Sequence, residues 1–140
     1  MKRSGDQIAR WVGVLLPCAV IALRIPSLIS NTELNVDESY FAVAALKYAQ
    51  GGLPWRDVDT ATSGPLNPLP LALILPWLPG LEYRAMHLCA ALLVAATVWL
   101  TWKTLIRLTS PLTAVLASAV GMAWIAVAQA RDHVHYSSEL

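Results

Sequence analysis

The stretch WVGVLLPCAVIALRIPSLI, residues 11–29, decides the fold class of this chain. It is apolar over about 19 residues, and at a rise of 1.5 Å per residue such a helix approaches the ~30 Å hydrocarbon thickness of a bilayer. The whole chain has a matching composition, because 56% of its 140 residues are hydrophobic and only 14% are charged. We therefore predict an all-α integral membrane protein, in which residues 11–29 form the first transmembrane helix.

Two further apolar runs have the features of membrane spans. Residues 85–102 are followed by Lys103, and Trp99 lies near the same end, as expected where a helix crosses the headgroups. The other run, residues 111–130, begins with Pro111 after a hydroxyl residue that can cap the helix. The sequence thus predicts three transmembrane helices.

A fourth apolar run, residues 66–81, is predicted not to span. It is short and contains four prolines, so we expect a re-entrant or surface-lying element at the outer membrane interface. The positive-inside rule supports this, since it places the basic segments 1–10 and 103–110 in the cytoplasm only if the chain crosses three times. The acidic loop of residues 30–84 and the tail of residues 131–140 then lie outside.

The net charge and the cysteines exclude other classes. A formal charge of +1 without a dense Lys/Arg run gives no basis for nucleic-acid binding. Cys18 and Cys89 lie within apolar runs, where we expect them to serve as packing residues. Arg24, near the outer end of the first span, is interpreted as a snorkelling anchor, with contact to a lipid phosphate as the alternative.

The external loop contains the main candidate for chemistry. Asn35 or Asp37 can cap an amphipathic helix from Glu38 to about Gln50, and the Gly51–Gly52 pair can end it. Asp37 and Glu38 in such a first turn are commonly helix-stabilising residues. The functional alternative is that a carboxylate at the membrane surface acts as general base on an acceptor hydroxyl.

A second polar cluster follows the third span and is predicted to face the same compartment. Arg131 has the geometry to bind a phosphate, although a snorkelling anchor is the alternative. His133 and His135, with Asp132 or Glu139, match no closed metal site, so no metal is assigned and a divalent ion is left open. No other cofactor is predicted.

These motifs together resemble the start of a GT-C glycosyltransferase. The similarity is to the protein O-mannosyltransferase and lipid A aminoarabinose transferase superfamily, particularly its bacterial RgtA/B/C/D-like members, and it covers nearly the whole chain but only the N-terminal third or less of such an enzyme. The motifs are Asp37-Glu38 with the aromatic Tyr40, Trp55-Arg56-Asp57-Val58, Gly64-Pro65-Leu66 and Gln129-x-Arg131.

The resemblance implies inverting transfer of a sugar from a polyprenyl-phosphate carrier to a lipid, glycan or protein acceptor outside the bacterial inner membrane. It implies catalysis by Asp37, with Glu38 beside it, and substrate binding by Tyr40, Arg131, Asp132 and Glu139. The His-Pro-Pro-Leu-Gly-Lys motif of the mannosyltransferases is absent, so mannose is not implied. The alternative is a non-enzymatic polytopic protein, such as a transporter or structural segment, and in either case we expect the chain to be a fragment.

Overall fold

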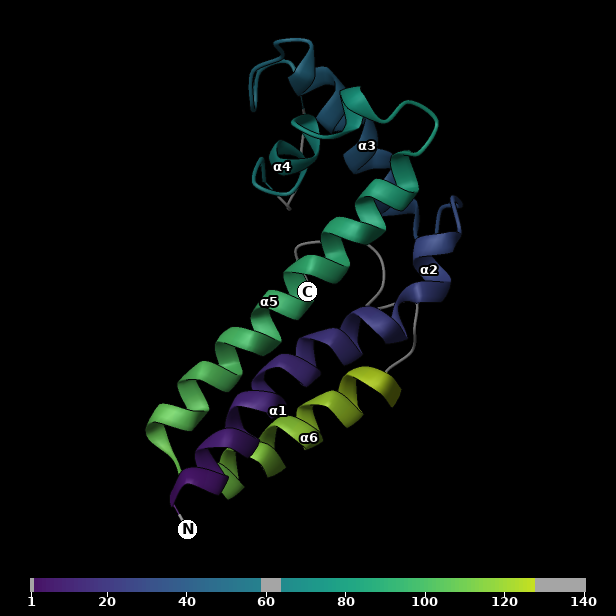
Figure 1. Cartoon of the computed structure of the whole chain (residues 1–140). Coiled ribbons are helices and arrows are strands. Elements are labelled where there is room, and N and C mark those ends of the chain that lie inside the picture. The colour runs from purple at the N-terminus through teal and green to yellow at the C-terminus, as the bar shows by residue number, and fades with distance from the viewer. Residues whose placement is uncertain (1, 59–63, 128–140) are drawn as a thin grey trace. The chain divides into compact units, whose positions relative to one another are not determined.

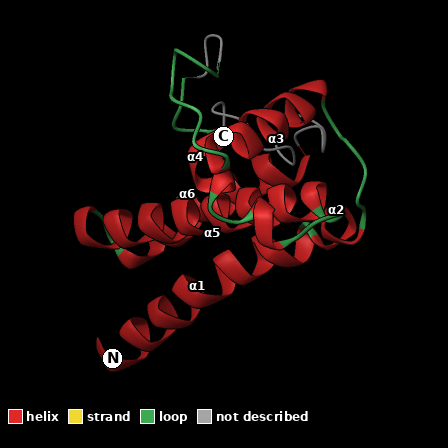
Figure 2. Cartoon of the chain, turned by 90° about the horizontal axis from the view of Figure 1, so that it is seen from above, coloured by secondary structure: helices red, strands yellow, loops and turns green. Residues whose placement is uncertain are grey.

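The computed structural model describes residues 2–58 and 64–127, with side chains for residues 11–58 and 64–121. The described residues form helices and turns without a strand, apart from one isolated bridge between Pro54 and Val58 (Figures 1 and 2). The prediction of a helical chain is therefore confirmed. The described residues divide into two compact units, one from residues 2–25 and 91–127 and the other from residues 26–58 and 64–90.

The first unit contains α1 (Lys2–Leu23), the later part of α5 (Glu82–Leu108) and α6 (Pro111–Val127). Helix α1 packs against α6 (Figure 1). Gly13 of α1 also approaches Trp102 of α5 closely, since a Cβ added at Gly13 would lie 2.5 Å from the indole Nε1. A glycine at this position therefore permits a contact that any larger residue would obstruct.

The predicted first span is not one continuous helix. Helix α1 ends at Leu23, and α2 (Ile25–Ile29) follows after a turn at Arg24. Pro26 explains the break, because its ring lacks an N–H donor and disfavours helical geometry at the preceding residue. Arg24 is only 5% exposed, whereas a snorkelling anchor has an exposed guanidinium. The interpretation of Arg24 as a snorkelling anchor is therefore wrong.

Helix α5 is longer than the predicted span of residues 85–102, because it begins at Glu82 and continues to Leu108. The expected connector of residues 103–110 is therefore mostly helical, and only Thr109 and Ser110 separate α5 from α6. Ser110 caps α6, since its Oγ accepts the N–H of Thr113 at 3.2 Å. Pro111 occupies the first helical position, as predicted.

Of the described residues, only α5 is long and apolar enough to cross a membrane. The apolar parts of the other two predicted spans, Trp11–Leu23 and Pro111–Gly121, are shorter than a span over the residues whose side chains are described. Three spans are thus not established, whereas one helix with the length and composition of a span is present.

The second unit is built around α3 (Val36–Ala49). Asn35 is the N-cap, because its Oδ1 accepts the backbone N–H of Asp37 at 3.0 Å, which decides between the two predicted caps. The helix ends as the glycine pair predicts: Gly51 adopts φ +92°, and Gly52 N–H donates to the Lys47 carbonyl at 2.9 Å. This 6→1 bond with a left-handed glycine is a Schellman motif.

The Pro-rich run folds as two short elements, α4 (Pro68–Ala72) and η2 (Leu75–Trp77). Its predicted interruption is confirmed, whereas its position at a membrane surface stays a prediction. Both elements pack on α3, and Leu71 and Leu75 join Phe41 in the core. The remaining buried members of that core are Ala42, Ala45, Ala85, Met86 and Ala90. This packing attaches α3 to the beginning of α5 and thereby positions the first turn of α3.

Candidate functional site

The first turn of α3 carries two adjacent carboxylates in opposite environments. Asp37 is exposed, whereas Glu38 is completely buried at 0% exposure. Successive residues of a helix point about 100° apart, so one can face solvent while the next faces the core. The sequence predicted both as site residues. In the structure, the Asp37 carboxylate faces solvent and the Glu38 carboxylate lies in the core.

Glu38 is held by two hydrogen bonds. Its Oε2 accepts the backbone N–H of Leu34 at 2.8 Å, and its Oε1 lies 3.1 Å from Nε2 of His87. His87 is 1% exposed and belongs to the first turns of α5. His87 was not predictable as a site residue, because a lone histidine in an apolar run carries no local signal of a partner 49 residues away.

The second ring nitrogen of His87 determines how protons are arranged. Nδ1 lies 2.9 Å from the carbonyl oxygen of Ser27, which can only accept, so Nδ1 carries a hydrogen. The contact between Nε2 and Oε1 then needs one further proton, held by either residue. With that proton the pair has no net charge in both arrangements, which suits a site without access to water.

Three more side-chain hydrogen bonds attach the loop before α3 and α3 itself to the start of α5 and the turn before it. Asn31 donates from Nδ2 to the Gly80 carbonyl at 2.7 Å, and its Oδ1 accepts the N–H of Arg84 at 3.2 Å. The hydroxyls of Ser39 and Tyr83 lie 2.8 Å apart. All three join residues more than 40 positions apart, so they fix the loop before α3 through Asn31 and the first turn of α3 through Ser39.

Asp37 is therefore an exposed acid in a helical turn that is attached to α5 by hydrogen bonds. Its backbone N–H is bound by Asn35, and in the described part of the chain no side chain pairs with its carboxylate. Asp37 is not the N-cap, so the capping explanation for this residue is wrong, although its charge still lies favourably at the positive end of the helix dipole. The carboxylate is available to a ligand.

The other predicted site residues are distributed differently. Tyr40 is 39% exposed, and its ring meets the ring of Phe41 edge to face with centroids 5.8 Å apart. Arg131, Asp132 and Glu139, together with the two weak metal candidates His133 and His135, lie outside the described residues. Within the described residues, no three His, Cys, Asp or Glu side chains form a metal-binding group.

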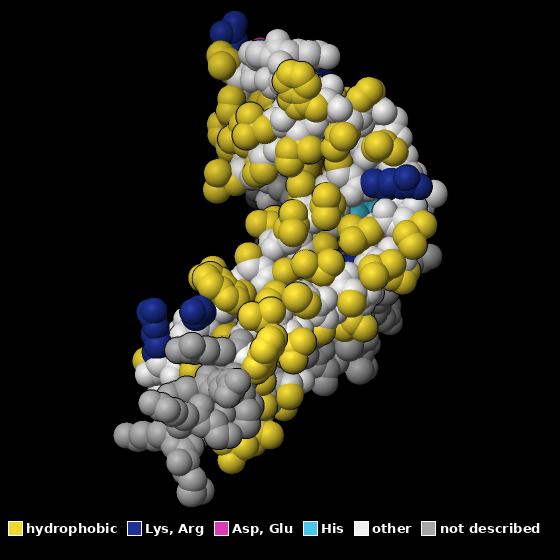
Figure 3. All heavy atoms as spheres, in the orientation of Figure 1, with side chains coloured by type: hydrophobic (Ala, Val, Ile, Leu, Met, Phe, Trp, Pro, Cys, Tyr) yellow, Lys and Arg dark blue, Asp and Glu magenta, His cyan; other side chains and the backbone are white. Residues whose placement is uncertain are grey.

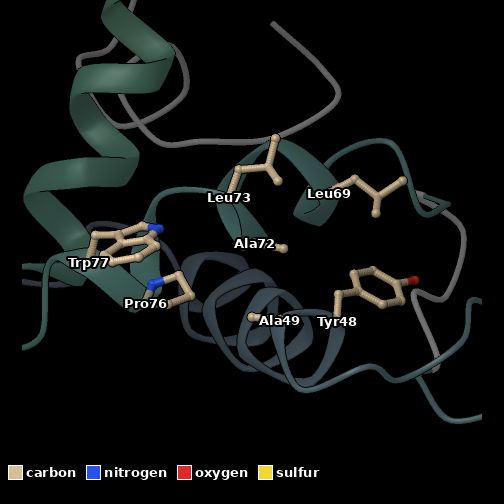
Figure 4. Close-up of a pocket in the computed structure, with 7 residues that line it drawn as sticks. All are labelled: Tyr48, Ala49, Leu69, Ala72, Leu73, Pro76 and Trp77. Carbon is tan, nitrogen blue, oxygen red and sulfur yellow. The ribbon is translucent and has the colours of Figure 1, made fainter.

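An apolar pocket of about 460 Å³ lies farther along α3. In Figure 4, Trp77 and Pro76 lie at one end and Tyr48 at the other, with Ala49 and Ala72 between them. Leu69 and Leu73 complete its lining. The lining has no charged side chain, and its polar side-chain groups are the Trp77 indole N–H and the Tyr48 hydroxyl, which makes no hydrogen bond within the described residues.

Comparison of the chain with protein-family models, with curated proteins and with solved structures finds no match.

Proposed function

We propose that this chain is the N-terminal part of a membrane glycosyltransferase in which Asp37 is the general base. The observation that carries the proposal is the arrangement at the start of α3. There, an exposed Asp37, whose carboxylate has no partner among the described residues, follows the cap and precedes a buried Glu38 that makes two hydrogen bonds. A general base must be positioned as well as accessible. Glu38 and His87 supply the positioning, and exposure supplies the access.

The proposed reaction needs little more than a base and a charge-stabilising cation. Asp37 takes the proton of an acceptor hydroxyl while the hydroxyl oxygen attacks the anomeric carbon of the donor sugar. The bond from that carbon to the carrier phosphate breaks, and the electron pair leaves with the phosphate. Because the phosphate is already a good leaving group, no acid is required for it, and Arg131 is the proposed cation.

The membrane location is part of the proposal and is supported by α5. Only 39% of the apolar 18-residue stretch within α5 is buried, whereas a helix in the core of a soluble protein would be mostly buried. Its exposed side chains include Leu88, Leu92, Leu93 and Leu100. Tyr83 and Arg84 precede the apolar stretch and Trp99 and Lys103 close it, the latter two in a cation–π contact at 5.3 Å.

The three-span topology also remains a proposal, with residues 11–29 and 111–130 as the other spans and the N-terminus in the cytoplasm. Under it, the loop that contains Asp37 faces the extracytoplasmic side of a bacterial inner membrane. The carrier is a polyprenyl-phosphate sugar, and the acceptor is a lipid, glycan or protein.

The deciding experiment compares Asp37→Asn with Glu33→Gln, which neutralises another exposed acid of the same loop. Sugar transfer is measured in membranes that contain the complete gene product and its lipid donor. An amide cannot take the proton, so Asp37→Asn is expected to lower transfer about a hundred-fold or more, while Glu33→Gln stays near wild type. Equal activity of a well-expressed Asp37→Asn protein would exclude Asp37 as the base.

One observation favours the alternative of a transporter segment. His87 and Glu38 form a buried ionisable pair beside an apolar helix, and such pairs within membranes can relay protons. Both nitrogens of His87 are occupied, however, and the residue lies only five positions into α5, near its end. Proton uptake by proteoliposomes that is lost in Glu38→Gln would establish the transport function instead.

A further inference from the structure

A second apolar groove, distinct from the pocket along α3, contains a positive charge. It has a volume of about 190 Å³ and is lined by Leu28, Leu78, Leu81, Arg84, Ala85 and Leu88. All six residues belong to the second unit, so the groove is formed within one compact body. Five of the six are apolar, and Arg84 is the one charged residue of the lining.

Arg84 is exposed and available to a ligand. Within the described residues its guanidinium makes no ion pair, and only its backbone N–H is bound, by Asn31. The neighbouring acid, Glu82, is directed to the backbone, since its Oε1 accepts the Gly80 N–H at 2.9 Å. Glu82 therefore makes no ion pair with Arg84 in the first turn of α5.

The groove has a polar end at Arg84 and an apolar end at Leu88, because these two residues of α5 lie at different heights along the helix. Leu88 follows Arg84 by four residues, so both lie on one face of the helix about 6 Å apart along its axis. Figure 3 shows dark blue Lys or Arg side chains bordered by yellow hydrophobic ones on the visible face of the described chain. A ligand complementary to this arrangement has an anionic head and a hydrocarbon tail.

We infer that this groove binds an anionic glycerophospholipid of the surrounding bilayer, with the phosphate on Arg84 and an acyl chain against Leu81, Leu88 and Leu28. A guanidinium donates two parallel hydrogen bonds to phosphate oxygens. The apolar lining favours a ligand with a hydrocarbon chain over an inorganic anion, because only the hydrocarbon chain covers the exposed leucines. The groove is also too large for one water, which occupies about 30 Å³.

The inference rests on the membrane location within the proposed function, but it does not require sugar transfer. A bound lipid beside Tyr83 and Asn31 would lie next to the contacts that hold the first turn of α3. Its expected role is to stabilise the loop that presents Asp37. A polyprenyl phosphate has related chemistry, so the experiment must separate it from a bilayer lipid.

The test is native mass spectrometry of the full chain released from neutral detergent micelles that contain equal amounts of phosphatidylglycerol and phosphatidylcholine. The wild type is expected to retain phosphatidylglycerol about five-fold over phosphatidylcholine, the preference that one juxtamembrane cation supplies. Arg84→Gln should bring the ratio close to one, and Arg84→Lys should retain most of the preference. Arg56→Gln, which removes another exposed arginine of the same unit, is the matched control and should behave as wild type.

Several outcomes would overturn the inference. An unchanged lipid ratio in Arg84→Gln, or no preference in the wild type, would remove Arg84 from lipid binding. Displacement of phosphatidylglycerol by free glycerol phosphate would show that the acyl chain contributes nothing, and displacement by equimolar polyprenyl phosphate would assign the groove to the donor. Asp37→Asn is expected to keep the lipid preference, so failure of the proposed catalysis remains distinguishable.

Discussion

Nε2 of His87 and Oε1 of Glu38 lie 3.1 Å apart in a fully buried contact between residues 49 positions apart in the chain. The contact connects the start of α3 to the start of α5. Because Glu38 is the immediate neighbour of Asp37, the same contact determines where the exposed carboxylate is presented. Two predictions about stability follow from this contact, a third concerns the packing of Gly13 against Trp102, and a fourth concerns the topology.

The first prediction compares two replacements of Glu38. In Glu38→Gln the amide can donate to Nε2 of a neutral His87 while its oxygen still accepts the Leu34 N–H, so the loss of stability should be about 1 kcal/mol or less. Glu38→Ala leaves the Leu34 N–H and Nε2 of His87 buried without a hydrogen-bond partner and should cost roughly 3 kcal/mol or more. Thermal unfolding in neutral detergent micelles measures both. Equal losses in the two variants would mean that the hydrogen bonds do not support the fold.

The second prediction concerns His87. His87→Ala leaves the Glu38 carboxylate buried without its partner, and breaking a buried pair in this way costs about 3–5 kcal/mol. The double variant Glu38→Gln/His87→Ala removes the unpaired charge and should recover part of the loss, with an interaction energy of about 1–3 kcal/mol. Strict additivity of the single variants would show that the two side chains do not interact.

The third prediction uses Gly13 and a second helical glycine as its control. Gly13→Ala places a methyl group against the Trp102 indole, whose nearest atoms would be 2.5 and 2.8 Å away. Overpacking costs about 1–3 kcal/mol, which should exceed the helix-propensity gain of about 1 kcal/mol. Gly121→Ala meets nothing within 4 Å and should leave stability equal or higher. A Gly13→Ala variant that is more stable than the wild type would show that α1 and α5 are not in contact at Gly13 and Trp102.

The fourth prediction concerns sidedness. Under the proposed topology, a cysteine at position 82 should react with an impermeant thiol reagent added outside intact cells, and one at position 105 should react only after permeabilisation. Cys18 and Cys89 are replaced by Ala or Ser beforehand, since both are free thiols. External labelling of position 105 together with protection of position 82 would reverse the orientation and move Asp37 to the cytoplasm.

Much of the local structure was predictable because its causes lie within a few residues. The end of α3 follows from Gly51 and Gly52, and the cap of α6 follows from Ser110 and Pro111. The four prolines of residues 66–81 predicted the broken element that became α4 and η2. These features depend on backbone hydrogen bonds and dihedral preferences over three to five positions, which a sequence carries directly.

The lengths of the apolar helices were less predictable, because hydropathy measures solvent preference and not backbone geometry. The apolar run of residues 85–102 indicated a span, yet the helix extends to Leu108, since nothing in Lys103 or Arg107 stops a helix. In the apolar run of residues 11–29 the prediction was wrong in the opposite direction, because the helix ends at Leu23, within that run. There, Pro26 interrupted a segment whose hydropathy is continuous.

The sequence by itself determined the helical class, the cap of α6, the end of α3, the broken Pro-rich element and the presence of two acids at the start of α3. Only the tertiary structure decided that Asp37 is exposed and Glu38 buried, and that His87, Asn31 and Tyr83 hold that turn in place. The reason is physical. A cap is formed by neighbours in the chain, whereas a pair separated by 49 residues forms only because the packing of Phe41, Leu71 and Met86 brings α3 onto α5.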